Sequence, residues 1–94
     1  MTTFSIPLFS IPLAPAKVTP GEILEKEFLE PLNISQNELA KRMNVPRMRI
    51  SQIVRGQRAI TAETAIKLAK ALGTSAQFWM NLQTAHDLAK EALK

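Results

Sequence analysis

Polar and basic side chains between residues 47 and 58 have the types and spacing that contact with DNA requires. An α-helix turns about 100° per residue, so the segment that begins at Arg47 gathers apolar residues on one side, namely Ile50, Ile53 and Val54. The opposite side and its flanks carry the candidate DNA contacts, which are Arg47, Met48, Arg49, Ser51, Gln52 and Arg55, with Arg58 extending the basic rim beyond the helix. In a major groove, arginine suits guanine, glutamine suits adenine and an apolar side chain suits the thymine methyl group. We therefore predict that this helix reads base edges.

The preceding segment has the features of a short helix followed by a tight turn. Ser35 can cap the helix while Glu38, three residues later, reaches back in a capping box. Asn44 tolerates the left-handed backbone that such a turn needs, and Pro46 suits the first turn of the next helix. The two helices form a predicted helix-turn-helix, in which Gln36 at the start of the first helix is expected to contact a backbone phosphate.

The charge distribution points the same way. The chain has 12 Lys plus Arg and 8 Asp plus Glu, but no acidic residue lies between Glu38 and Glu63, a stretch that holds six basic residues. The predicted first helix, around residues 20 to 31, carries four glutamates against a single lysine. A basic face attracts phosphate and makes binding dependent on salt. An ordinary solvated basic surface is the alternative interpretation.

Composition limits the other possibilities. A chain of 94 residues without cysteine suits one small domain in the cytoplasm, and no apolar run is long enough for a membrane span or has the form of a signal peptide. His86 and Asp87 point about 100° apart on a helix, and the glutamates near residues 22 to 30 have no nucleophile or metal ligand beside them. We expect no enzyme activity, no metal site and no cofactor.

The N-terminal segment, residues 1 to 18, is set apart by its tandem FSIPL repeat at Phe4 to Leu8 and Phe9 to Leu13. Its prolines exclude a helix, so we expect an extended arm. Two interpretations remain open, a mobile tail and a segment that docks on its own domain or on a partner. Residues 19 to 94 form the predicted DNA-binding domain.

The remaining patterns are helical, so the chain is predicted to be an all-α fold of five helices. Helix one is expected to bury Ile23, Leu24 and Phe28 and to stop before Pro31. Helix four, capped by Thr61 and ended by Gly73, carries an apolar stripe of Ala65, Ile66, Ala69 and Leu72. Helix five carries a longer one, Phe78, Trp79, Leu82, Ala85, Ala89 and Leu93. Because reading a palindrome takes two recognition helices, we predict a homodimer with the helix-five stripe as its interface. For Phe78, Trp79 and Leu82, burial in the chain's own core is the competing interpretation.

Residues 19 to 91 resemble antitoxins of the HigA/VapI type, a branch of the Cro/repressor (XRE-like) helix-turn-helix family. The helix-turn-helix residues occur in many repressors, whereas three flanking motifs resemble this branch: PGEIL at 20–24, RAITAETA at 58–65 and FWMNLQ at 78–83. The chain departs from the family at Thr19, where His is frequent, at Asn44, where Gly is frequent, and in the doubled FSIPL.

The resemblance implies a lambda-repressor-like domain that binds operator DNA before its own operon, represses it as a dimer, and neutralises an mRNA-cleaving toxin of the RelE-like fold. It also implies that Trp79 is a structural residue of helix five near the dimer region. Two alternatives stay open at this stage. One is a phage-type or chromosomal repressor without a toxin partner, and the other is a small enzyme or interaction module that shares only the fold.

Overall fold

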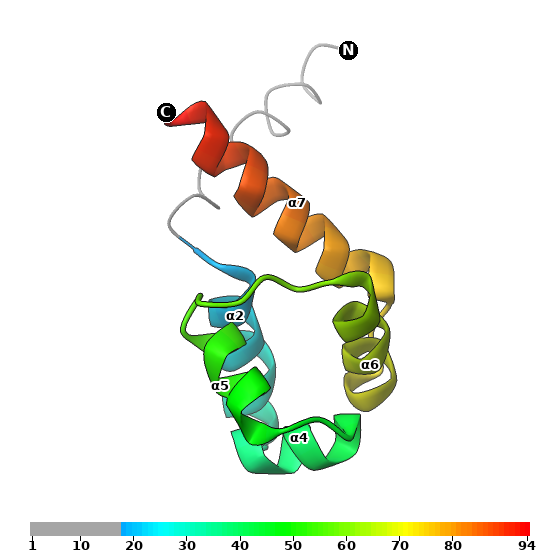
Figure 1. Ribbon diagram of the computed structural model, residues 1–94. Coiled ribbons are helices and arrows are strands. Elements are labelled where there is room, and N and C mark those ends of the chain that lie inside the picture. Colours follow the sequence, from blue (N-terminus) through cyan, green and yellow to red (C-terminus); the bar gives the residue numbers. More distant parts are fainter. Residues whose placement is uncertain (1–17) are drawn as a thin grey trace.

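The computed structural model of the protein describes residues 18–94, which form helices and connecting turns without a strand (Figure 1). Helix one consists of three consecutive segments, α2 (Pro20–Ile23), the π-helical η2 (Leu24–Leu29) and α3 (Glu30–Leu32). It is followed by α4 (Gln36–Met43), α5 (Arg47–Val54), α6 (Ala62–Leu72) and α7 (Ala76–Ala92). The predicted all-α, five-helix fold is confirmed. The predicted arm lies, except for Val18, outside the described residues.

Four helices begin at a hydroxyl side chain that accepts a hydrogen bond from the backbone three residues later. The Ser35 hydroxyl accepts a hydrogen bond from the Glu38 N–H at 3.0 Å, and the Thr61 hydroxyl accepts one from the Thr64 N–H at 3.3 Å. Thr19 and Ser75 cap α2 and α7 in the same way. Each such cap contributes about 1 kcal/mol by satisfying a donor that the helix leaves unpaired. The predicted caps at Ser35 and Thr61 are confirmed. The reverse half of the predicted capping box is absent, because the Glu38 carboxylate instead accepts from Arg42 Nε at 3.2 Å.

Left-handed residues end several helices and set the directions of the turns. Asn44 has φ 56° and ψ 48° after α4, as predicted, and Gly73 has φ 76° after α6. Asn33 adopts the same conformation after helix one with φ 56° and was not predicted. The Asn44 turn directs α5 across α4, the arrangement that a helix-turn-helix requires.

Helix one continues through Pro31, contrary to the prediction that it stops before this residue. The reason lies in the π-helical stretch, where the Glu30 N–H donates to the Glu25 carbonyl, one residue farther back than in an α-helix. Widening the turn relieves the clash that a proline ring makes with an α-helical carbonyl. The sequence rule for proline failed here because it assumes regular α-helical spacing.

The core is formed where the five helices meet. Its largest fully buried side chains are Trp79, Leu24, Leu39, Ile50, Ile53 and Leu68. The Phe28, Phe78 and Trp79 rings form a cluster with centroids 5.0 to 5.9 Å apart, which joins helix one to the start of α7. Aromatic pairs of this kind stabilise by about 1 kcal/mol beyond the area they bury. Leu24 is buried as predicted, while Ile23 and Phe28 are half-buried.

On α6 the buried face differs from the predicted stripe. Thr64, Ala65 and Leu68 are buried, whereas Ile66 is 49% exposed. Residues 64, 65 and 68 share one helical face, and Ile66 follows Ala65 by about 100° in the direction away from it. The predicted stripe is wrong at Ile66 because the spacing of apolar residues does not show where the other helices cover α6, and a polar hydroxyl does not prevent the burial of Thr64.

Gly21 lies at a close approach of α2 and α5. A Cβ atom added at this position would overlap the Ile53 carbonyl oxygen and lie 2.6 Å from the Ile53 carbonyl carbon and 2.8 Å from Val54 Cα. All three atoms belong to the backbone of α5, so no side-chain rotation could make room. The absence of a side chain at Gly21 therefore fixes the distance between helix one and α5.

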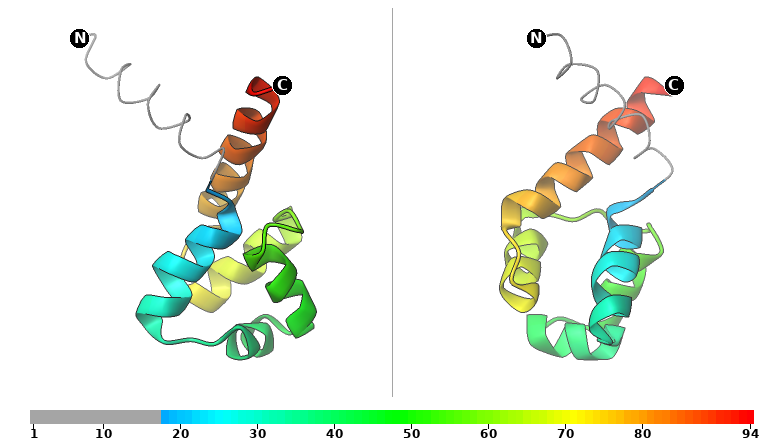
Figure 2. Two further views of the ribbon diagram at one scale, coloured as in Figure 1. Left: turned by 90° about the vertical axis from the view of Figure 1, so that its left-hand side faces the viewer. Right: turned by 180° about the vertical axis from the view of Figure 1, so that it is seen from behind.

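Gln83, buried on α7, connects this helix to the loop that precedes α6. Its Oε1 accepts a hydrogen bond from the Ile60 N–H at 2.8 Å, and its Nε2 donates to Asp87 Oδ1 at 2.9 Å. The C-terminal end of α7 extends away from the other helices (Figure 2).

Candidate nucleic-acid interface

The outer side of α5 presents basic and apolar side chains to solvent. Arg47, Met48 and Arg55 are exposed, Met48 by 62%, and Arg58 is exposed in the loop beyond the helix. The opposite side of α5 buries Ile50 and Ile53. The two predicted faces of this helix are therefore present, and the predicted DNA contacts named here lie on or beside the outer one.

Ser51 does not lie on the outer face, contrary to the prediction. Its side chain is buried, with 9% exposure, and its Oγ accepts a hydrogen bond from Arg55 Nη2 at 2.7 Å. The prediction failed because a small polar side chain on the flank of a helix carries no signal of whether a neighbouring element covers it. In this position the Ser51 hydroxyl holds the guanidinium of Arg55, and the contact of Ser51 with DNA stays a prediction.

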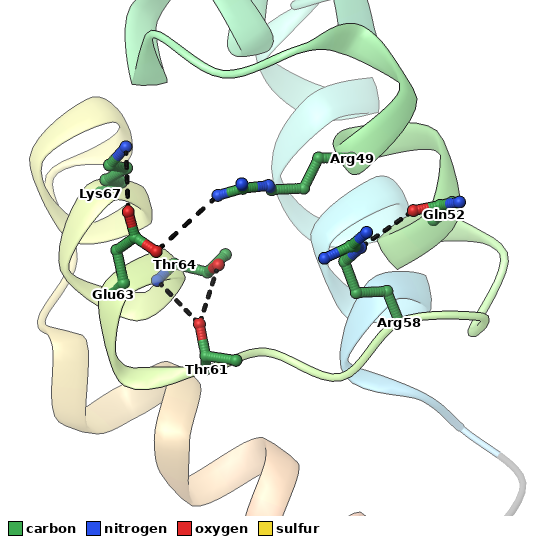
Figure 3. Close-up of polar contacts among 7 residues, drawn as sticks. All are labelled: Arg49, Gln52, Arg58, Thr61, Glu63, Thr64 and Lys67. Atoms are coloured by element: carbon green, nitrogen blue, oxygen red, sulfur yellow. Dashed lines mark hydrogen bonds and ion pairs between the residues drawn. The ribbon is translucent and has the colours of Figure 1, made fainter.

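Gln52 and Arg58 form a hydrogen-bonded pair across the end of α5. Gln52 is half-buried, and its Oε1 accepts from Arg58 Nε at 2.9 Å (Figure 3). The sequence predicted both residues as DNA contacts but gave no reason to join them, because they are six residues apart and on different elements. The loop geometry that joins them follows from Gly56, which has φ 76°.

Arg49 points from α5 toward the first turn of α6. Its Nη1 lies 4.0 Å from Glu63 Oε1, and Lys67 Nζ lies 3.5 Å from the other carboxylate oxygen (Figure 3). Glu63 is 65% exposed, so water screens both ion pairs and each is weak. This carboxylate is the first acidic residue after the basic stretch, and it partly neutralises the basic side chains beside the outer face of α5.

Gln36 is the first residue of α4 and is half-buried. Ser35 precedes it in an extended conformation, so α4 begins at the surface beside the helix-turn-helix. The positive end of a helix dipole favours an anion there. The placement agrees with the predicted phosphate contact without testing it.

On α7 the residues predicted for a dimer interface divide into two groups. Trp79 is fully buried, and its Nε1 donates to Thr74 Oγ1 at 2.6 Å, so it belongs to the core and has no surface left for a second subunit. Phe78 and Leu82 are half-buried and pack against the core.

The remaining residues predicted for the interface lie farther along α7. Ala85 and Ala89 are half-buried, whereas Leu93 is 75% exposed. Leu88, which was not predicted, is 66% exposed.

Residues 18–94 contain no group of three or more His, Cys, Asp or Glu side chains placed to hold a metal ion. Within the same residues no helix is both long enough and apolar enough to cross a membrane. His86 is buried on α7, next to Asp87, which accepts a hydrogen bond from Gln83.

The geometry of α4 and α5 defines a helix-turn-helix protein, and comparison with known proteins agrees. Residues 26–79 match the helix-turn-helix family model HTH_3. The chain belongs to this family.

Its relatives include several bacterial regulators and antitoxins. The chain is 51% identical over 58 residues to Virulence-associated protein I of Dichelobacter nodosus, a match that covers 62% of this chain and 54% of that protein. It is 48% identical over 58 residues to Antitoxin HigA-1 of Vibrio cholerae, again covering 62% and 54% of the two chains. The matched region thus spans about half the length of the curated relatives.

Solved structures extend the similarity over more of the fold. The chain superposes on Pseudomonas aeruginosa antitoxin HigA, solved with higBA promoter, with a TM-score of 0.76 and 47% identity over 79% of this chain and 80% of that one. An addiction module antidote protein of the HigA family from Coxiella burnetii gives a TM-score of 0.73 and 47% identity, covering 81% and 82% of the two chains.

Proposed function

We propose that the protein is an antitoxin that binds operator DNA and represses its own operon. The observation that carries this proposal is the outer side of α5, where exposed arginines flank Met48 and Gln52 on a helix presented by a preceding helix and a left-handed turn. The similarity to an antitoxin solved with promoter DNA supports the same assignment.

In the proposed complex, the outer face of α5 enters the major groove. Met48 and Gln52 face base edges, where an apolar side chain contacts a thymine methyl group and an amide pairs with a purine edge. Arg47 and Arg49 are placed near the N-terminal end of α5, where recognition helices approach the bases. Arg55 contacts the backbone, with its guanidinium held by Ser51. Ser51, which is buried, is proposed to position Arg55 and not to contact a base itself.

The N-terminus of α4 is proposed to contact a backbone phosphate beside the groove. Gln36 opens this helix, and an amide side chain donates to phosphate while the helix dipole favours its charge. Such contacts fix the register of the protein on the duplex but carry no sequence information.

The functional unit is proposed to be a homodimer joined through the outer part of α7. Two recognition helices must lie about 34 Å apart to read successive half-sites on one side of the duplex. The exposed Leu88 and Leu93, together with the half-buried Ala85 and Ala89, are apolar residues in the C-terminal half of α7. The end of this helix extends away from the other helices (Figure 2). Apolar side chains that water surrounds in a monomer favour association with a second copy.

The protein partner is proposed to be an mRNA-cleaving toxin of the RelE-like fold. The support is the similarity to proteins named HigA antitoxins in Vibrio cholerae and Pseudomonas aeruginosa. A regulator without a toxin is the second candidate, because an uncharacterised HTH-type transcriptional regulator of Escherichia coli is 47% identical over 58 residues.

Two experiments test the proposal. The first selects duplexes from a random-sequence library and compares binding to the DNA upstream of the gene, across salt concentrations. We expect selection of a two-fold symmetric site that also occurs upstream of the gene; equal binding to selected and random duplexes would refute operator recognition. The second co-expresses the chain with the product of the neighbouring gene, expecting a stable complex and rescue of growth. DNA recognition without either effect would leave the repressor alternative.

A further inference from the structure

We propose that Arg58 sets the specificity of DNA recognition by holding the amide of Gln52 in one orientation, so that the two side chains read one base pair as a unit. The proposal rests on the proposed function as a DNA-binding protein and adds a positioning residue to it. It starts from the hydrogen bond of 2.9 Å between Arg58 Nε and Gln52 Oε1.

The chemistry of the two groups fixes which end of the amide faces Arg58. A guanidinium only donates hydrogen bonds, and of the two ends of a glutamine amide only the oxygen accepts. With Oε1 directed toward Arg58, the NH₂ group of Gln52 is directed away from it (Figure 3). A free glutamine can rotate its amide by 180° and exchange donor for acceptor, and the bond to Arg58 removes that freedom.

The orientation matters because base edges differ in their donors and acceptors. In the major groove, guanine presents two acceptors, thymine one, and adenine an acceptor beside a donor, whereas cytosine presents only a donor. An amide whose NH₂ group is directed at the groove favours bases that accept a hydrogen bond and disfavours cytosine. An amide that rotates freely can pair with any of the four bases. Fixing the amide therefore sharpens the choice of base.

The loop that carries Arg58 is itself held at both ends. On one side, the Gln57 N–H donates to the Gln52 carbonyl at 2.8 Å, after the left-handed turn at Gly56. On the other side, the Ile60 N–H donates to the buried Oε1 of Gln83. Arg58 therefore projects from a short segment between two fixed points, which makes the pair with Gln52 available before DNA arrives.

Arg58 keeps the capacity for a second contact. Nε is used for Gln52, and the two terminal nitrogens of the guanidinium remain available to phosphate oxygens, which arginine binds in a planar, forked geometry. A phosphate contact alone would raise affinity for every sequence equally. The proposal differs from that simpler role because it requires Arg58 to change the preference at the base pair that Gln52 reads.

The test measures affinity for the selected duplex and for duplexes carrying each base substitution, at several salt concentrations. Four proteins form a cycle: the wild type, Gln52→Ala, Arg58→Ala and the double variant. Arg47→Ala serves as the matched control, since Arg47 is exposed at the other end of α5. Gln52→Ala first identifies the base pair, by lowering its preference about 5- to 150-fold.

We expect Arg58→Ala to lower the preference at that same base pair at least 3-fold and also to weaken binding to random duplex. In the Gln52→Ala background, Arg58→Ala should weaken binding without changing that preference further. Arg47→Ala should leave the preference at that base pair unchanged. In the free protein, the side-chain NH₂ resonances of Gln52 should shift on Arg58→Ala and not on Arg47→Ala.

The inference is overturned if Arg58→Ala weakens all duplexes equally, as a phosphate contact would, or if Gln52→Ala changes no base preference. Either result would leave the proposed DNA-binding function standing. A wild-type protein that shows no preference for the selected duplex would instead refute the proposed function, and the inference with it.

Discussion

Replacing Gly21 with alanine changes the stability of the fold through two opposing effects, a higher helix propensity in α2 and a clash with the backbone of α5. Alanine is a better helix former than glycine by about 1 kcal/mol, so on propensity alone the substitution stabilises α2. The structure predicts the opposite sign. The new Cβ would lie 2.6 Å from the Ile53 carbonyl carbon, whereas nonbonded carbons prefer about 3.5 Å or more. The overlap with the Ile53 carbonyl oxygen is closer still, so helix one and α5 would have to separate by more than about 1 Å.

The cost of this separation sets the expected magnitude. Extra atoms in a packed interior cost about 1 to 3 kcal/mol, and the upper end applies because the obstacle is helix backbone. We expect a net loss of about 2 kcal/mol, which lowers the Tm of a domain of this size by roughly 10 °C. Because the shift moves α5, operator affinity should also fall, even at temperatures where the variant is fully folded.

Thermal unfolding and DNA titration, run side by side, measure both effects. Gly73→Ala is the matched control, because nothing lies within 4 Å of its added Cβ and only the positive φ of 76° opposes the change. That variant should lose about 1 to 2 kcal/mol and keep its DNA affinity when folded. A Gly21→Ala protein at least as stable as the wild type would refute the close approach of α2 and α5.

Three further predictions concern the interface and the assembly. Glu63→Gln should strengthen binding to any duplex a few-fold by releasing Arg49 and Lys67, with little change in stability because the ion pairs are exposed; anisotropy titrations should show no such gain for Glu30→Gln on helix one. Gln36→Glu should weaken operator binding by placing a negative charge at a phosphate, and unchanged affinity in a gel-shift titration would mean that α4 does not contact the backbone. Leu93→Lys should yield a folded monomer in sedimentation, whereas Leu32→Lys, at another exposed leucine, should not change the oligomeric state.

Local chemistry explains which parts of the fold could be predicted from the sequence. Ser35 and Thr61 cap helices through bonds to the next turn, and Asn44 adopts a left-handed backbone for reasons contained in its own side chain. The helix periodicity likewise placed Ile50 and Ile53 in the core. Such signals involve neighbours within about one turn, so the chain order alone contains them.

The errors arose where contacts between distant segments decide the outcome. For Trp79, the sequence left both the core and the dimer interface open, because an apolar stripe on α7 fits either location. Its full burial and its contact with Phe28 on helix one place it in the core. Ser51 is buried, which a small polar side chain on the flank of a helix does not indicate. The pairing of Gln52 with Arg58 depends on how the loop turns after Gly56, which residue types alone do not specify.

The hydrogen bond from Ile60 to Gln83 places the loop that bears Arg58 and the helix proposed for assembly in one mechanical unit. A displacement of α7, whether by a second subunit or by a bound protein, moves the acceptor to which this loop is attached. Coupling between two binding sites is reciprocal in free energy, so DNA that selects one position of the loop also selects the position of α7 that supports it. In such a protein, occupancy of the operator and occupancy of α7 would each change the affinity for the other ligand, and the bond between Ile60 and Gln83 is one contact that links the two sites.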